Sequence, residues 1–161
     1  MFRKLIFGLL ALVTMQFVFD SSAQMVNPYG LPISVDTAKK LAAAAITEAR
    51  KNNWAMAVAI ADINGDLVYF EKMDGTQTGS VKVAIGKARS AALFKRPTKV
   101  WQDALAAGGE GLRVLGIEGA VPVEGGLPLL LDGKIIGAIG CSGGTSQQDG
   151  VAAKAGAEAL K

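Results

Sequence analysis

Small and apolar residues recur every three or four positions in several stretches of the chain, and this spacing predicts amphipathic helices. Ser34 is placed to cap the first helix, and Asp36 in its first turn suits the positive end of the helix dipole. Pro97 stops the second helix, and Thr98 directly after it can cap the third. The predicted helices cover 35–51, 80–95, 98–107 and 147–160.

Two pairs of short apolar runs are joined by turn sequences, which predicts two β-hairpins. Asn64-Gly65 joins the first pair and Asp132-Gly133 joins the second. These dipeptides are strong hairpin signals because both of their residues readily adopt a positive φ. The segment 112–123 has no clear periodicity, and a short strand is one option there. The predicted strands cover 54–62, 66–73, 127–131 and 134–141.

The order of the predicted elements is helix, hairpin, two helices, hairpin and helix. Hairpins pair their strands antiparallel, and the regular strand–helix alternation of a doubly wound parallel sheet is absent. The pattern therefore predicts a single α/β domain of the α+β kind, in which helices flank a central antiparallel sheet of about five strands.

The first 23 residues have the organisation of a signal peptide. Arg3 and Lys4 precede an almost unbroken apolar stretch over 5–19, and small residues lead up to Ala23. A membrane anchor is the alternative, but this stretch falls short of the roughly 20 residues that span a bilayer. We therefore expect residues 1–23 to be cleaved, and residues 24–161 to form a periplasmic or secreted domain without a stable membrane anchor.

Charge and composition remove several classes of function. The net charge is +3, and the basic residues are scattered without a basic face, so we expect no nucleic-acid partner. Cys141 is the only cysteine, which excludes an internal disulfide. The chain contains no His, so it has neither a Ser-His-Asp nor a Cys-His catalytic pair and no zinc site built from His.

Five segments, in order along the chain, together resemble one known family. They are ADINGDLV at 61–68, KMDG at 72–75, the helical segment 84–94 followed by KRPT at 95–98, EGGLP at 124–128, and the stretch 132–144 that ends in GAIGCSGG and is followed by Gln148 and Asp149. Each piece alone is weak, but the ordered set is specific. On these motifs, the domain 24–161 resembles the GlcG/HbpS (haem-binding-protein-like) family, and the resemblance runs from about Ser34 to Leu160. This family also includes the C-terminal domain of PduO-type proteins.

This resemblance implies a profilin-like fold and assembly as a homo-oligomer. It also implies a small-molecule ligand, because several members bind haem or are linked to cobalamin or iron metabolism. The many Ala residues of the first and last predicted helices suit close helix packing, within a subunit or between subunits.

Three charged residues are candidates for a ligand pocket: Asp74 beside a glycine at a strand end, Lys87 in the second helix, and Glu124 before a double glycine. A carboxylate and an ammonium at one pocket mouth would bind a polar ligand. The plainer interpretation makes Asp74 a turn or cap residue and places Lys87 on a solvated helix face. The residue types and their positions fit both interpretations.

The glycine-rich loops are a second group of candidates. Glycines at such positions most simply provide unusual φ angles or close packing. The alternative is a cradle of backbone N–H groups that holds an anionic group at a helix N-terminus. The residues concerned are Gly125, Gly126, Ser142, Gly143 and Gly144.

Haem is the cofactor that the family resemblance favours, and the lack of His bears directly on it. Haem iron is usually held by His, Cys, Met or Tyr. The candidates here are Met73, Tyr69, Met56 and Cys141, although each is more common as a core residue than as a ligand. Where family members use His this sequence departs from them. Haem would then be held by apolar contacts, with its propionates on Lys side chains.

Three hypotheses of function follow. The first is an exported protein that binds a small molecule, with haem or a related tetrapyrrole as the ligand. The second is an enzyme or enzyme accessory that acts on a small organic acid through Asp74, Lys87 and Glu124. The third is a structural subunit whose role is to form an oligomer.

Overall fold

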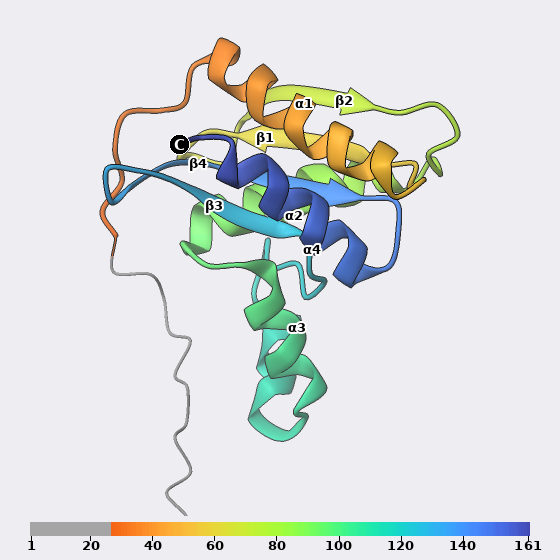
Figure 1. Ribbon diagram of the computed structural model, residues 1–161. Helices are drawn as coiled ribbons and strands as arrows, with labels where there is room; N and C mark the ends of the chain where they lie inside the picture. Colours follow the sequence, from red (N-terminus) through yellow and green to blue (C-terminus); the bar gives the residue numbers. More distant parts are fainter. Residues whose placement is uncertain (1–26) are drawn as a thin grey trace, which may run out of the picture.

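The computed structural model describes residues 27–161, and the predicted signal peptide lies outside them. Figure 1 shows a sheet with helices on both faces and a helical projection that extends away from it. The central antiparallel sheet that the sequence predicts is confirmed. The elements are α1 (Val35–Lys51), β1 (Ala57–Ala61), β2 (Leu67–Lys72), α2 (Ser80–Phe94), α3 (Thr98–Ala106), the 3-10 helix η1 (Gly109–Gly116), β3 (Gly126–Leu131), β4 (Lys134–Ser142) and α4 (Ser146–Glu158).

The four strands pair antiparallel in the order β2-β1-β4-β3, so β1 and β4 occupy the centre. The sequence AVAIA of β1 divides its side chains between two faces. Val58 and Ile60 pack in the core that α1 and α4 cover, whereas the alanines of β1 face α2. These small residues let α2 approach closely: Gly140 of β4 lies against the backbone of Ala84, where a methyl group would collide.

Local signals set the ends of two helices. α1 has the predicted bounds, and the Ser34 hydroxyl accepts a hydrogen bond from the backbone N–H of Thr37 at 3.3 Å. α4 begins with a reciprocal capping box between Thr145 and Gln148. This box fixes where the chain leaves β4 and enters α4, which matters for the buried charges described below.

The structure differs from the sequence predictions between α2 and β3. Residues 112–123 contain no strand, because positive φ angles at Gly108 and Gly109 turn the chain into η1. The described sheet has four strands, one fewer than expected; an isolated parallel bridge between Tyr29 and Ile135 extends it. Thr98 does not cap α3, which is preceded by Pro97 as its N-cap.

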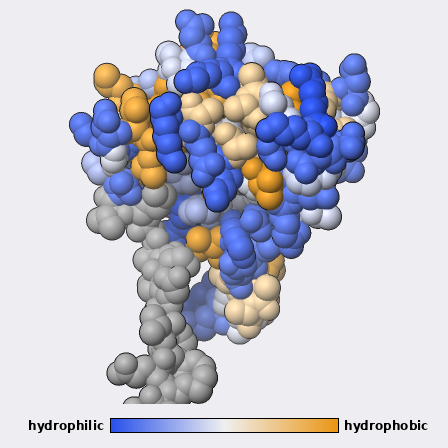
Figure 2. Space-filling model, viewed as in Figure 1, coloured by the Kyte–Doolittle hydropathy of each residue, from blue (hydrophilic) through white to orange (hydrophobic). Residues whose placement is uncertain are grey.

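Within residues 27–161, none of the helices is both long enough and apolar enough to cross a membrane. Figure 2 shows the face over α1 and α4 as hydrophilic side chains around a central area of moderate hydrophobicity. The projection formed by α3 and η1 carries two exposed large apolar residues, Leu112 and Leu115.

Candidate functional site

Lys87 and Asp149 form a buried ion pair between α2 and α4. Their side chains are 1% and 4% exposed, and Lys87 Nζ lies 2.6 Å from Asp149 Oδ2. Lys87 also donates a hydrogen bond to the backbone oxygen of Cys141 in β4 at 3.0 Å. Lys87 therefore lies neither at a pocket mouth nor on a solvated helix face. It joins three elements inside the molecule.

The double glycine before β3 makes room for this ion pair. Gly125 has a φ of 123°, and a Cβ there would lie 2.9 Å from Lys87 Nζ and 2.7 Å from the Cβ of Asp149. A Cβ on Gly126 would lie 2.5 Å from the backbone oxygen of Lys87. The Gly126 N–H donates a hydrogen bond to Thr98 Oγ1 at 2.9 Å. These glycines are thus required by close packing.

The loop between β4 and α4 supplies hydrogen-bond donors to the same carboxylate. The Gly144 N–H donates to Asp149 Oδ1 at 3.0 Å. Burial raises the pKa of Asp149, while the Lys87 ammonium and the N–H groups of Gly143 and Gly144 oppose that shift. The Gly143 and Gly144 N–H groups therefore surround the protein's own Asp149 carboxylate, not an anionic ligand as the alternative interpretation expected.

Two more predicted residues lie at the same end of the sheet. The Ser142 hydroxyl is buried and hydrogen-bonded to the Ser80 hydroxyl at 3.2 Å. Glu124 is half-buried, and its carboxylate packs against Gly150 in α4. Its backbone N–H donates to the Gln102 side chain at 2.8 Å. Glu124 thus borders the ion-pair cluster from the outside.

The candidates on and after β2 are separate from the ion pair. Met73 lines a small pocket of about 280 Å³ together with Arg50, Asn53, Trp54 and Ala55 at the end of α1. Tyr69 lies within β2, where its hydroxyl donates to Glu71 at 3.2 Å. Asp74 is exposed in the turn that follows β2. Asp74, Lys87 and Glu124 therefore do not converge on one described pocket.

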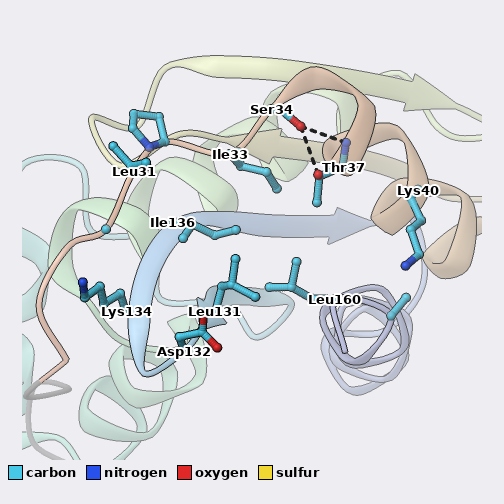
Figure 3. A pocket seen from close by; sticks show the side chains of 13 residues that line it. Leu31, Ile33, Ser34, Thr37, Lys40, Leu131, Asp132, Lys134, Ile136 and Leu160 are labelled. Carbon is cyan, nitrogen blue, oxygen red and sulfur yellow. Dashed lines mark hydrogen bonds between the residues drawn. The ribbon is translucent and has the colours of Figure 1, made fainter.

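A larger pocket lies at the opposite end of α4, and sequence reasoning missed it. Its volume is about 490 Å³, and it opens between the chain before α1, the start of α1 and the β3–β4 turn. We call it the hairpin pocket (Figure 3). The lining residues are Gly30, Leu31, Pro32, Ile33, Ser34, Thr37, Lys40, Leu131, Asp132, Lys134, Ile136, Ala159 and Leu160.

The hairpin pocket has an apolar centre and charged ends. Figure 3 shows Ile33 and Ile136 in the middle, with Lys134 at one end and Lys40 at the other. Asp132 adds one carboxylate near the hairpin turn. A neighbouring pocket of about 360 Å³ shares Leu131, Asp132 and Leu160 with it, so the apolar surface continues around the end of β3. This arrangement suits an apolar ligand that carries anionic groups.

Sequence comparison places these features in a family. The family model described as "Haem degrading protein HbpS-like" matches residues 33–158. The chain is 38% identical to the protein GlcG of Escherichia coli K12 over 110 residues, which cover 68% of this chain and 81% of that protein. The match includes every element of the described fold from α1 to α4.

Solved structures agree with the sequence match. The crystal structure of HbpS superposes with a TM-score of 0.75 at 28% identity, covering 82% of this chain and 92% of that one. The crystal structure of a PduOC:haem complex superposes with a TM-score of 0.72 at 27% identity, covering 80% of this chain and 95% of that one. The chain thus belongs to the HbpS-like family, which includes GlcG.

Proposed function

We propose that this protein binds an amphipathic small anion, namely haem or a related tetrapyrrole, in the hairpin pocket. The observation that carries the proposal is an apolar pocket of about 490 Å³ with an ammonium group at each end. Small-molecule sites typically measure 300–1,000 Å³ and combine apolar walls with a few polar groups. The haem complex of PduOC, a structural relative, supports this choice of ligand.

The residues of the pocket fit the organic part of haem. Ile33, Leu131, Ile136 and Leu160 would contact the macrocycle, and Lys40 and Lys134 would pair with propionates. When bound, haem would supply its redox-active iron, whereas the chain's own residues would hold the macrocycle and shield it from water. The proposal assigns the chain no proton transfer, and the buried Lys87–Asp149 pair remains structural.

The organic-acid hypothesis has less support. It needs Asp74, Lys87 and Glu124 around one ligand, but Lys87 is fully buried and engaged by Asp149 and Cys141. Asp74 lies exposed at the end of β2. The geometry therefore favours binding over catalysis by these residues.

The proposal includes export and self-association. Export rests on the signal peptide predicted at 1–23, and N-terminal sequencing of the exported protein should find a start near Gln24. Self-association rests on the moderately hydrophobic surface over α1 and α4. Light scattering should give at least a dimer mass; a monomer at tens of micromolar would contradict this part.

Haemin titration of the mature protein, followed in the Soret region, tests the proposed function. Leu31→Asp places a carboxylate on the apolar wall, at a side chain that is 86% exposed and therefore tolerant of change. Leu115→Asp is the matched control, because Leu115 is also exposed but lies on η1. We expect saturable haemin binding that Leu31→Asp weakens at least fivefold and Leu115→Asp leaves unchanged.

A second pair of variants tests the cationic ends. Lys40→Glu and Lys39→Glu change the net charge equally, and both residues are exposed on α1, but only Lys40 belongs to the pocket lining. Lys40→Glu should weaken haemin binding a few-fold, since exposed ion pairs contribute about 0.2–1 kcal/mol each. Equal effects of the two variants would refute this site, and unsaturable binding by the wild type would refute the function.

A further inference from the structure

The structure shows where each side chain of the kinds that usually hold haem iron lies within residues 27–161. Those kinds are His, Cys, Met and Tyr. The chain has no His at all. The described residues of the other three kinds are Tyr29, Met56, Tyr69, Met73 and Cys141.

The two of these that lie in the protein interior have no exposed surface. Met56 and Cys141 are 0% exposed and belong to the core between the sheet and the helices α1 and α4. Burial raises the pKa of the Cys141 thiol well above its usual range, so the thiolate that would bind iron does not form at neutral pH. Neither residue lines the hairpin pocket.

The other three are engaged elsewhere on the molecule. The Tyr29 hydroxyl donates to the backbone oxygen of Ala92 at 2.8 Å, and Lys95 Nζ lies 4.2 Å from the centre of the Tyr29 ring. The Tyr69 hydroxyl donates to Glu71. Met73 Sδ accepts the N–H of Met56 at 3.5 Å and lines the pocket at the other end of α1.

The two hydroxyl groups that line the hairpin pocket already form hydrogen bonds within the protein. The hydroxyl oxygens of Ser34 and Thr37 are hydrogen-bonded at 3.0 Å, and the Ser34 hydroxyl also caps α1 by accepting the Thr37 N–H. Figure 3 shows both bonds above the apolar centre formed by Ile33 and Ile136. The described lining therefore presents apolar carbon, the ammonium groups of Lys40 and Lys134 and the Asp132 carboxylate to a ligand, and it contains none of the side chains that usually ligate haem iron.

We propose that the hairpin pocket binds the macrocycle and its carboxylates and supplies no ligand to the iron. This inference rests on the proposed function. Removing the metal from a porphyrin leaves its apolar area and its two carboxylates in place, and these are the features that the pocket walls and Lys40 and Lys134 can contact. The ligand class is thus a tetrapyrrole dicarboxylate, with or without metal.

The test compares three probes on the mature protein: haemin, metal-free protoporphyrin, and the dimethyl ester of that porphyrin. Binding is followed by quenching of tryptophan fluorescence, which does not depend on iron. Haemin and the metal-free porphyrin should bind within about threefold of each other. The dimethyl ester should bind about three- to tenfold more weakly at low salt, because it loses both carboxylate charges, and added salt should narrow this gap.

Variants test whether the porphyrin probes bind in the hairpin pocket. Leu31→Asp should weaken both haemin and the metal-free porphyrin, whereas Leu115→Asp should weaken neither. Met73→Ala and Tyr69→Phe should leave the Soret position of bound haemin unchanged.

Haemin binding tenfold or more tighter than the metal-free porphyrin would overturn the inference and leave the proposed function standing. A Soret shift in Met73→Ala or Tyr69→Phe would do the same. Failure of all three probes to bind would instead overturn the proposed function itself.

Discussion

The contact between Lys87 and Asp149 shows how strongly single residues depend on their surroundings in this fold. A buried charge is tolerated when it is paired and hydrogen-bonded. Lys87 meets this condition through Asp149 and the Cys141 carbonyl, and Asp149 does so through Lys87 and the Gly144 N–H. The sequence singled out Lys87, but only the fold reveals Asp149 as its partner, 62 positions away.

Removing one partner of this pair should be far more damaging than replacing both. Lys87→Met leaves Asp149 buried without its counter-charge, which typically costs about 3–5 kcal/mol of unfolding free energy. Lys87→Met combined with Asp149→Leu removes both charges and should recover much of that loss. Urea denaturation of the wild type, Lys87→Met and the double variant measures the three unfolding free energies. A double variant no more stable than Lys87→Met would contradict a structural role for the pair.

The Lys87→Met variant should also acquire a distinct pH dependence. Burial raises the pKa of Asp149, and Lys87 is the main group that counteracts this rise. In the Lys87→Met variant the pKa of Asp149 should therefore rise further. A carboxyl group whose pKa is higher in the folded than in the unfolded state favours folding at low pH, and this contribution is lost as the pH rises through the folded pKa. The variant's deficit relative to wild type should therefore be larger at pH 7 than at pH 4.5; a deficit independent of pH would argue against this explanation.

At the scale of elements, the sequence predicts what is decided locally and misses what is decided by tertiary contacts. α1 has the predicted bounds because its periodicity and the Ser34 cap are both encoded in consecutive residues. Both hairpins form where the turn dipeptides predict them. Only Asp132-Gly133 has a positive φ at both residues, because in the first turn Gly65 has one and Asn64 does not. Thr98, by contrast, has the residue type of a helix cap, but its hydroxyl accepts a hydrogen bond from the distant Gly126 N–H. The positive φ angles of Gly108 and Gly109 turn the chain into η1.

The bond from Gly126 to Thr98 ties α3 to the start of β3, and its loss should be measurable. Thr98→Val keeps the shape of the side chain but leaves the buried Gly126 N–H without its acceptor, which should cost about 1–3 kcal/mol. Thr47→Val is a suitable control because Thr47 is exposed on α1. Thermal or urea unfolding should show a clear loss only for Thr98→Val, and equal losses would mean that the bond adds little.

On the scale of the whole molecule, the hairpin pocket is assembled from segments that no local pattern connects. Its walls come from the lead-in before α1, from α1 itself, from the β3–β4 hairpin and from the end of α4. In the sequence, Ile33 and Ile136 are ordinary core residues and Asp132-Gly133 is an ordinary turn. Five of the predicted candidates came from glycine-rich loops. Three of these five serve the Lys87–Asp149 pair instead: Gly125 and Gly126 pack against Lys87, and the Gly144 N–H donates to Asp149.

The location of bound haemin tests the central claim most directly. In a methyl-labelled sample, the paramagnetic iron of haemin should broaden NMR signals from nearby side chains. We predict broadening of the methyl groups of Leu31, Ile33, Ile136 and Leu160, with those of Leu115 on η1 unaffected. Broadening centred on Met73, or on Leu115, with the hairpin-pocket methyl groups unchanged, would contradict the account.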